Sequence, residues 1–328
     1  MLCPFCLADV AFTLERPKNR PAPLYLCSNP ECKQEIPSLY VRDYSSFPPV
    51  VMSAVGFRGH GKTVYFAALF HVFKRSPLAR YWPNFLTLCP SEEDLETVYR
   101  NVEMLQEGTL PDATPKNFPR PTMIRIRGLP MQPDCTLLCY DTGGECFEKP
   151  RQLVQYAGFV KRARTAVLLI DLSRLKNPAE EMHRLLEIYV IGLADLGGRT
   201  RDQHLAVVYT KADELGVRLH NWPDLRGYLT EGAVDGLASP RHYMARLHAV
   251  SDRLQQFTGA ELQGHGFLHL ARHSFRSVSF SMVSSLGARP AGNKLTAEIV
   301  PRRVLDPLLW LQHRSLPKWK QTLQKWRV

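Results

Sequence analysis

Residues 56–63 form a glycine-rich segment whose residue types suit the binding of a phosphate chain. The segment reads Gly-Phe-Arg-Gly-His-Gly-Lys-Thr, with glycines at Gly56, Gly59 and Gly61. These glycines let the backbone turn its amide groups inward without Cβ clashes, and a helix starting here would point its positive end at the same anion. Lys62 would bring a positive charge to the β- and γ-phosphates, and the Thr63 hydroxyl would be a ligand for Mg²⁺. The segment therefore predicts a site for a nucleoside triphosphate and magnesium.

The residues on both sides of this loop predict the elements that position it. Residues 50–55, Val-Val-Met-Ser-Ala-Val, indicate a buried strand, and residues 64–70 indicate a helix with an apolar face. A strand, a glycine-rich loop and a helix in this order are the context in which the motif binds phosphate. We therefore expect Val64, at the start of the helix, to lie against the nucleotide. Arg58 and His60, inside the loop, could also reach the γ-phosphate, and His60 is counted with the nucleotide-binding residues, although variable loop residues more often face solvent.

Two later predicted strands each end in a short polar motif. Residues 135–140 run into Asp141-Thr-Gly-Gly144, and residues 205–209 run into Thr210-Lys-Ala-Asp213. The Asp141 carboxylate could hold Mg²⁺, and the Gly144 amide could contact the γ-phosphate and report its presence. Because ligands of doubly wound sheets bind outside the carboxyl ends of the strands, both motifs should face the glycine-rich loop.

With these three motifs the chain resembles the translation-factor-like, or TRAFAC, class of P-loop GTPases. In that class the motif Asn/Thr-Lys-x-Asp reads guanine: the Asp accepts hydrogen bonds from N1–H and the exocyclic amino group, and the Lys stem stacks on the base. Asp213 and Lys211 match those positions, while Thr210 stands in place of the commoner Asn. The resemblance implies GTP as the ligand. The alternatives are an ATPase and a purely helix-capping role for Asp213.

The same resemblance suggests roles for three further segments. Residues Ser284, Ser285 and Leu286 are similar to a loop that contacts guanine through its backbone. A threonine in the proline-rich loop 107–119 would close on Mg²⁺ when GTP is bound, and Thr114 is our candidate. Glu145 stands where many GTPases have a water-orienting glutamine. A carboxylate beside the phosphates orients water less favourably unless a metal or an arginine screens it, so we expect slow hydrolysis with Lys62, Thr114 and Glu145 as the catalytic residues.

Four of the eight cysteines form two close pairs near the amino terminus. Cys3 and Cys6 are separated by two residues, and Cys27 and Cys32 by four. Two such pairs suit one tetrahedral Zn²⁺, and a site made only of cysteines is structural. An iron–sulfur centre and two disulfides are the alternatives; the disulfides conflict with the lack of a secretory signal and with the cytosolic motifs.

These motifs predict four parts of an α/β protein. We expect a zinc ribbon over residues 1–40, a linker over 41–49, a P-loop GTPase domain over 50–300 and a C-terminal helix with a basic tail over 301–328. The domain should contain a doubly wound, mainly parallel sheet. The seventy residues between Asp213 and Ser284 exceed what a compact GTPase needs there, which predicts a helical insertion around 216–276.

The charge is uneven along the chain. The net charge is +11, yet residues 301–328 alone carry seven Lys and Arg against one Asp, together with Trp319 and Trp326. This tail fits RNA, an acidic partner, a membrane surface, or a helix docked on the domain with its lysines in water. No apolar run approaches the roughly 20 residues that a bilayer span needs, so we expect no transmembrane segment and a cytoplasmic location.

A narrower resemblance covers residues 50–311. The Leu-Pro-x-x-Thr-Pro segment at 110–115, the Asp-Thr-Gly-Gly motif and Arg-x-Leu-Asp-Pro-Leu-Leu-Trp at 303–310, behind a zinc ribbon, are similar to bacterial GTPases with double-GTPase or TRAFAC-clade domains. That resemblance implies a GTP-driven switch read by a protein partner, such as another GTPase, in an antiphage defence system. The alternative function is a nucleotide-gated nucleic-acid-binding module that uses the zinc ribbon and the basic tail.

Overall fold

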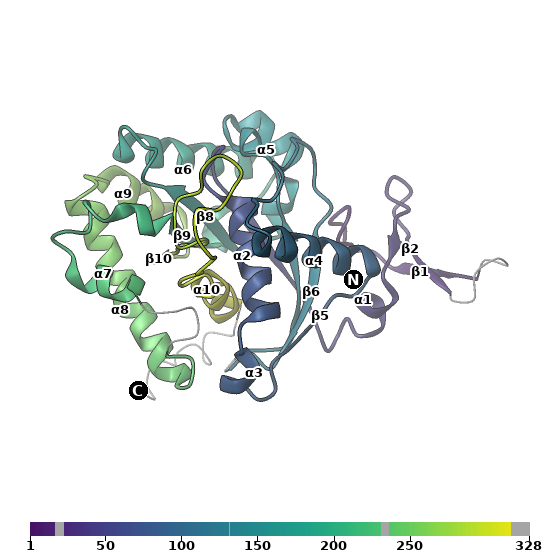
Figure 1. The fold of residues 1–328 in the computed structure, drawn as a ribbon. Helices are drawn as coiled ribbons and strands as arrows, with labels where there is room; N and C mark the ends of the chain where they lie inside the picture. Colours follow the sequence, from purple (N-terminus) through teal and green to yellow (C-terminus); the bar gives the residue numbers. More distant parts are fainter. Residues whose placement is uncertain (17–22, 131, 231–235, 316–328) are drawn as a thin grey trace.

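The chain forms a seven-stranded sheet covered by helices, with a small three-stranded sheet at its amino terminus (Figure 1). The computed structural model describes residues 1–16, 23–130, 132–230 and 236–315. The large sheet has the order β10-β9-β8-β4-β7-β6-β5. Its strands are β4 (Pro49–Val55), β5 (Leu86–Leu88), β6 (Thr122–Arg127), β7 (Cys135–Tyr140), β8 (Thr165–Asp171), β9 (His204–Thr210) and β10 (Ser277–Met282).

Strands β7, β4, β8, β9 and β10 are parallel, and β6 and β5 add two antiparallel strands at one edge. All seven residues of β8 and of β9 are buried, as expected of parallel strands covered on both faces. The predicted α/β class with a mainly parallel sheet is therefore confirmed.

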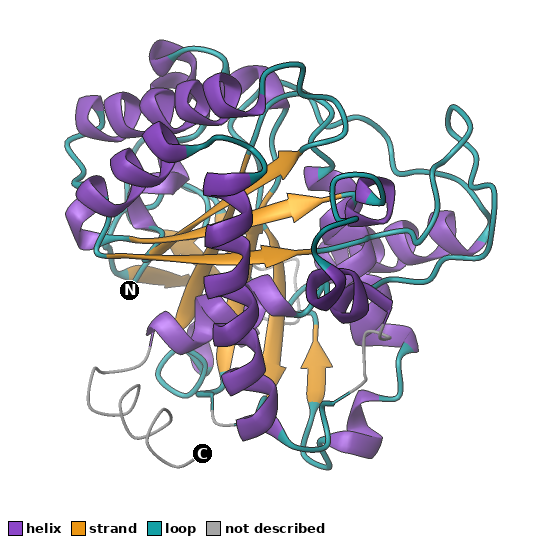
Figure 2. Ribbon diagram, turned by 90° about the vertical axis from the view of Figure 1, so that its left-hand side faces the viewer, coloured by secondary structure: helices purple, strands orange, loops and turns teal. Residues whose placement is uncertain are grey.

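Helices lie on both faces of the sheet (Figure 2). Alternate residues of β4 show the division, because Met52 and Ala54 pack toward one layer and Val51 and Val55 toward the other. The first layer contains α2 (Lys62–Arg75), α4 (Glu92–Gln106) and α10 (Asp306–Ser315), and the second contains α5 (Pro150–Tyr156), α6 (Pro178–Asp195) and α9 (His265–Ser274). The short helix α3 (Leu78–Tyr81) follows α2.

The segment predicted as a helical insertion forms α7 (Pro223–Thr230), α8 (Pro240–Ala260) and α9 before the chain enters β10. Helix α8 contributes Met244 and Leu247 to one core layer and Leu254 and Phe257 to the other. It therefore closes the β10 edge of the sheet.

The cysteine-rich amino terminus consists of β1 (Phe12–Glu15), β2 (Leu24–Cys27) and β3 (Glu35–Ile36), paired antiparallel, followed by α1 (Ser38–Arg42). The segment 41–49, which we expected to be a linker, is packed against β6. Arg125 of β6 pairs with Asp43 at 2.8 Å, donates a hydrogen bond to the Leu39 carbonyl and lies over the Phe47 ring. The amino-terminal unit, which we call the ribbon (residues 1–42), is therefore joined to the sheet directly at Leu39 and through the segment that follows it.

The C-terminal helix α10 is docked on the sheet. Its first residue, Asp306, is fully buried and accepts hydrogen bonds from the Tyr228 and Tyr243 hydroxyls, while Arg303 lies over the Tyr228 ring at 3.9 Å. Burial raises the pKa of Asp306 to about 6. The Arg-x-Leu-Asp motif therefore anchors this helix. The rest of the predicted basic tail, with Trp319 and Trp326, lies outside the described residues.

Within those described parts, none of the helices combines the length and the apolar character that crossing a membrane would require.

Candidate nucleotide site and zinc centre

The glycine-rich loop connects β4 to α2, as its sequence predicted. Gly59 and Gly61 have φ angles of +83° and +78°, in the left-handed region that side chains with a Cβ rarely adopt. A Cβ on Gly56 would lie 2.6 Å from the Leu169 carbonyl oxygen of β8. All three glycines are therefore required by the shape of the loop and its closeness to the sheet.

Lys62 begins α2 and folds back into the loop. Its Nζ donates hydrogen bonds to the carbonyl oxygens of Gly56 (2.9 Å) and Phe57 (3.2 Å). Burial lowers the pKa of this ammonium, and the carboxylates of Asp141 and Glu145 act in the opposite direction. Because phosphate oxygens are stronger acceptors for an ammonium than neutral carbonyls, a polyphosphate in the loop would give Lys62 better partners.

Three side chains with oxygen atoms, from segments distant in sequence, lie close together near this lysine. The hydroxyls of Thr63 and Thr114 lie 2.8 Å apart, and the Thr114 hydroxyl donates to Asp141 Oδ2 at 2.6 Å. Asp141 Oδ1 is buried without a hydrogen-bond partner, and burial raises the pKa of this carboxyl group. A hard cation with oxygen ligands would satisfy the orphaned oxygen, so the three residues fit Mg²⁺.

The Asp-Thr-Gly-Gly turn packs closely against the glycine-rich loop. A Cβ on Gly144 would lie 2.1 Å from the Arg58 amide nitrogen, which only glycine permits. The next residue, Glu145, has its Oε1 atom 3.5 Å from Arg58 Nε. The carboxylate expected to disfavour hydrolysis therefore has an arginine beside it.

The Thr-Lys-Ala-Asp turn braces the glycine-rich loop. The Thr210 hydroxyl donates to the His60 carbonyl oxygen at 3.0 Å, and Lys211 Nζ donates to the Gly59 carbonyl oxygen at 3.2 Å. Threonine in place of the commoner Asn thus still reaches the loop backbone.

Asp213 is exposed, borders the cavity and is held by the Ser284 turn. The Ser284 hydroxyl donates to Asp213 Oδ1 at 2.5 Å and accepts from the Gly287 amide at 3.0 Å. Ser285 and Leu286 line the cavity, whereas buried Ser284 acts by holding Asp213.

The side chain of His60, a candidate for contact with the γ-phosphate, does not border the cavity. The ring is buried, and its Nδ1 lies 2.9 Å from the Leu169 carbonyl oxygen. Burial lowers its pKa to about 4. The ring therefore anchors the loop to β8, while the His60 carbonyl oxygen accepts the hydrogen bond from Thr210. Val64, as expected, borders the cavity.

Sequence reasoning missed Asp171, the last residue of β8. Its fully buried carboxylate accepts hydrogen bonds from Lys211 Nζ at 2.5 Å and from the Ser173 hydroxyl at 2.6 Å. Burial alone would raise its pKa, but the hydrogen bonds from Lys211 and Ser173 hold the pKa below its usual value. An aspartate at the end of an otherwise apolar strand was the available signal.

All these segments border one cavity of about 730 Å³. Its outer wall comes from two loops, residues 110–114 and 285–293, which sequence reasoning did not connect. The Leu110 amide donates to the Asn293 carbonyl oxygen at 3.0 Å, and the Leu295 amide donates to that of Gly108 at 2.8 Å. The loop that carries Thr114 is therefore tied to the loop that follows the Ser284 turn.

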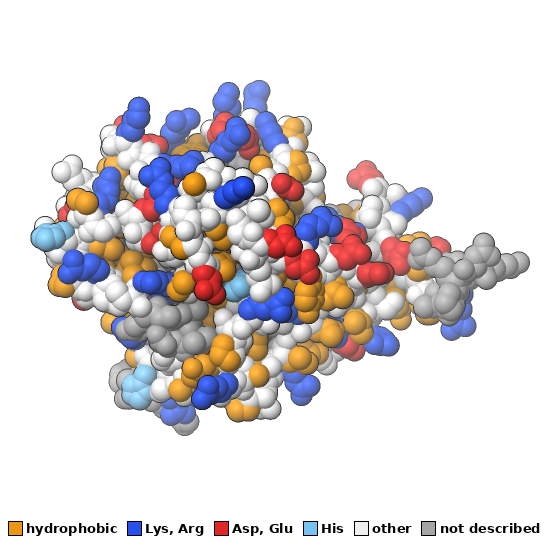
Figure 3. All heavy atoms as spheres, in the orientation of Figure 1, with side chains coloured by type: hydrophobic (Ala, Val, Ile, Leu, Met, Phe, Trp, Pro, Cys, Tyr) orange, Lys and Arg blue, Asp and Glu red, His pale blue; other side chains and the backbone are white. Residues whose placement is uncertain are grey.

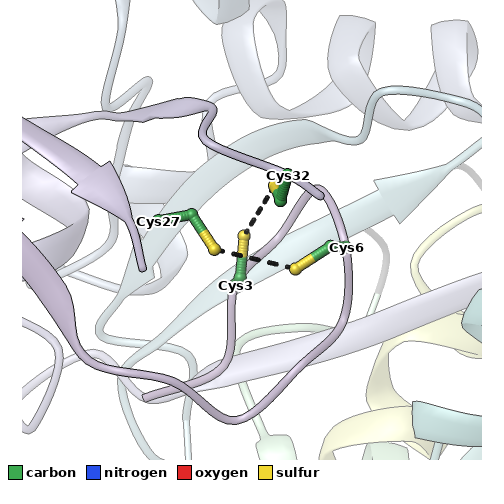
Figure 4. A group of neighbouring side chains, drawn as sticks. All are labelled: Cys3, Cys6, Cys27 and Cys32. Carbon is green, nitrogen blue, oxygen red and sulfur yellow. Dashed lines mark hydrogen bonds between the residues drawn. The ribbon is translucent and has the colours of Figure 1, made fainter. Parts of the chain in front are cut away.

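The four amino-terminal cysteines converge on one point (Figure 4). The Sγ atoms of Cys3 and Cys32 lie 3.9 Å apart, and those of Cys6 and Cys27 lie 3.7 Å apart. Tetrahedral zinc with bonds of about 2.3 Å places its sulfurs about 3.8 Å from one another. The separations match this value and are far longer than the roughly 2.05 Å of a disulfide, so the group is suited to zinc.

The four-cysteine cluster suited to zinc, which we call the zinc centre, lies beside the candidate nucleotide site. The Tyr140 hydroxyl donates to the Pro4 carbonyl oxygen, between Cys3 and Cys6, at 2.5 Å, and Tyr140 directly precedes Asp141. The Arg120 guanidinium, in the loop after Thr114, lies 4.8 Å from the centre of the Phe5 ring. The ribbon therefore contacts both segments that bring Asp141 and Thr114 together.

The parallel sheet, the phosphate-binding loop at the end of β4 and the two turns facing it define a P-loop protein of the GTPase type. Sequence comparison agrees, because the model of the Double-GTPase 2 family matches residues 50–295. The chain belongs to this family of P-loop GTPases. No curated protein matches the chain.

Proposed function

We propose that the protein is a GTP-dependent switch that binds GTP with Mg²⁺, hydrolyses it slowly and acts on a protein partner. The family places the chain among GTP-binding and GTP-hydrolysing proteins. The observation that carries the proposal is the contact of Thr63, Thr114 and Asp141, since it joins the phosphate loop to a distant loop through oxygen atoms suited to magnesium. In this proposal the four cysteines of the ribbon bind Zn²⁺, which has a structural role.

Each residue has a defined task in this proposal. The glycine-rich loop and Lys62 hold the β- and γ-phosphates, while Asp213 accepts hydrogen bonds from the guanine edge. Thr63, Thr114 and Asp141 would hold Mg²⁺, which would supply positive charge beside the phosphates. The Thr114 hydroxyl would then leave Asp141 and face the metal, so that its loop would sense the γ-phosphate. Glu145, a carboxylate close to those phosphates, would keep unaided hydrolysis slow.

Exposed apolar side chains support a protein as the partner that binds this switch. Leu86 and Leu88 are 57% and 42% exposed on β5, the edge strand, and Leu95 and Tyr99 are exposed on the neighbouring α4. Figure 3 shows acidic side chains around α4 and toward the ribbon, consistent with the exposed Glu92 and Glu93 in the first turn of α4. An acidic surface with apolar residues favours a protein partner over a nucleic acid. The resemblance to defence-system GTPases is the basis for placing that partner, such as another GTPase, in antiphage defence.

The proposal is tested by measuring GTP hydrolysis and backbone hydrogen exchange in the same samples. Residues 108–120 should exchange more slowly with a non-hydrolysable GTP analogue and Mg²⁺ than with GDP, because the γ-phosphate would order the loop. Thr114→Ala should remove this difference, whereas Thr114→Ser, which keeps the hydroxyl, should retain it. Identical exchange with GDP and the analogue in the unaltered protein would contradict a switch, and rapid unaided hydrolysis would contradict its slow rate.

A further inference from the structure

Arg58 is a cation inside the phosphate loop to which the proposed function assigns no task. It lies within the phosphate loop, it lines the cavity, and its amide is the group that Gly144 touches. Its guanidinium is 81% exposed and has Glu145 as its ion-pair partner at 3.5 Å. An ion pair exposed to this degree is weak, so Arg58 can leave Glu145 readily.

The other cations that line the cavity are held elsewhere. Lys211 and Arg174 both pair with Asp171 and also lie against Gly59 of the loop, and Arg289 lies 3.9 Å from Glu214. Lys62 lies inside the loop, where the proposed function has it hold the β- and γ-phosphates. Among the described residues that border the cavity, Arg58 and Lys62 are the cations that lie against the turn from Asp141 to Glu145.

The charges near the γ-phosphate strongly affect the rate of GTP hydrolysis. In the transition state negative charge spreads over the oxygens of the transferred phosphoryl group, and a positioned arginine stabilises it strongly. Glu145 adds a negative charge nearby, which has the opposite effect. A site with this carboxylate therefore needs a further positive charge on the γ-phosphate if it is to hydrolyse GTP.

We propose that Arg58 is the arginine that stabilises the transition state from within the chain, and that Glu145 holds it away from the γ-phosphate in the resting protein. This inference rests on the proposed GTPase function. The oxygen of water bonds to the γ-phosphorus while the bond to the bridging oxygen breaks, and the electron pair of that bond stays on the β-phosphate. One water proton leaves to solvent through a γ-phosphate oxygen, giving GDP, inorganic phosphate and a proton. Arg58 contacts the γ-phosphate oxygens during this step.

Four variants separate this role from simple neutralisation of Glu145. Single-turnover hydrolysis should slow about 30-fold or more in Arg58→Ala, as expected for loss of an in-chain arginine, with GTP affinity changed less than about threefold. Arg58→Lys should recover part of the rate. Glu145→Gln should accelerate hydrolysis because it releases Arg58, and the double variant Arg58→Ala with Glu145→Gln should be as slow as Arg58→Ala alone.

A double variant as fast as Glu145→Gln would overturn the inference, since Arg58 would then only neutralise the carboxylate. Hydrolysis by Arg58→Ala at the unaltered rate would overturn it as well. A second readout is the complex of GDP with aluminium fluoride, a mimic of the transferring phosphoryl group, which should form with the unaltered protein and fail to form with Arg58→Ala. Absence of GTP binding by the unaltered protein would instead overturn the proposed function, together with this inference.

Discussion

The zinc centre and the nucleotide site differ in how the chain builds them. All four sulfurs of the zinc centre come from residues 3–32, and each close pair lies in its own turn. The nucleotide site draws on residues from Arg58 to Asn293, and strands β4, β7, β8 and β9 bring its parts together. The first site is a property of a short segment, whereas the second is a property of the order of strands in the sheet.

The two regions also differ in exposure. Cys3 and Cys27 are buried and Cys6 and Cys32 are partly buried, and four cysteine sulfurs around one tetrahedral ion would leave no position for an exchangeable ligand. The nucleotide site is an open cavity whose charged side chains, such as Arg58, are exposed and able to change partners. A closed site stabilises one structure, and an open one can distinguish ligand states.

The largest effect is expected at the zinc centre, because a structural zinc supplies much of the folding energy of a small ribbon. Cys27→Ala should lower the zinc content from one ion per chain to none, measured by elemental analysis. GTP affinity should change less than about threefold, since the residues of the ribbon do not line the cavity. Cys89→Ala is the matched control and should keep its zinc, because Cys89 lies outside the cluster.

A full zinc content in Cys27→Ala would refute the four-cysteine centre. Loss of GTP binding in that variant would show instead that the two sites cannot be separated.

The next largest effect is expected from Lys62→Ala, which removes the ammonium that, in the proposed function, holds the β- and γ-phosphates. The affinity for GTP should fall about 100-fold or more, because each charge-assisted hydrogen bond contributes roughly 1.5–3 kcal/mol. Calorimetric titration measures this directly. Lys74→Ala, at the far end of the same helix, should bind GTP normally. Unchanged affinity in Lys62→Ala would remove the phosphate-binding role of the loop.

Asp213→Asn should change which base is preferred. The asparagine can no longer accept both guanine hydrogen bonds, so GTP binding should weaken about 100-fold, while its amide can donate to the carbonyl that xanthine has in place of the guanine amino group. Xanthosine triphosphate should then compete better than GTP. Glu214→Gln, the neighbouring acid, serves as the control, and a variant that still prefers GTP would argue against Asp213 as the base-reading group.

The smallest effect concerns the contact between the two regions. Tyr140→Phe removes the hydrogen bond to Pro4, which should cost about 1 kcal/mol in the free energy of unfolding. Tyr40→Phe removes a comparable bond to the Leu2 carbonyl oxygen within the ribbon. If the ribbon influences the switch, only Tyr140→Phe should alter the hydrogen exchange of residues 108–120. Equal exchange in both variants would indicate two independent regions.

Sequence alone predicted the parts of both sites that depend on local spacing. The cysteine pairs, the phosphate loop and the polar turns after β7 and β9 each have a pattern within about ten residues. Asp171 and the contact of residues 108–110 with residues 293–295 lack such a pattern, because their roles arise only when β8 lies beside β9 and one loop meets another. His60 illustrates the same limit, since its direction depends on Leu169, which is distant in sequence.

The most direct test of the account is competition for one nucleotide site. Labelled GTP bound to the purified protein with Mg²⁺ should be displaced by unlabelled GTP at concentrations at least about 100-fold lower than those of ATP, because Asp213 matches hydrogen-bond donors that adenine does not present. Displacement by ATP and GTP at equal concentrations would contradict guanine recognition, and with it the assignment of this protein as a GTP-dependent switch.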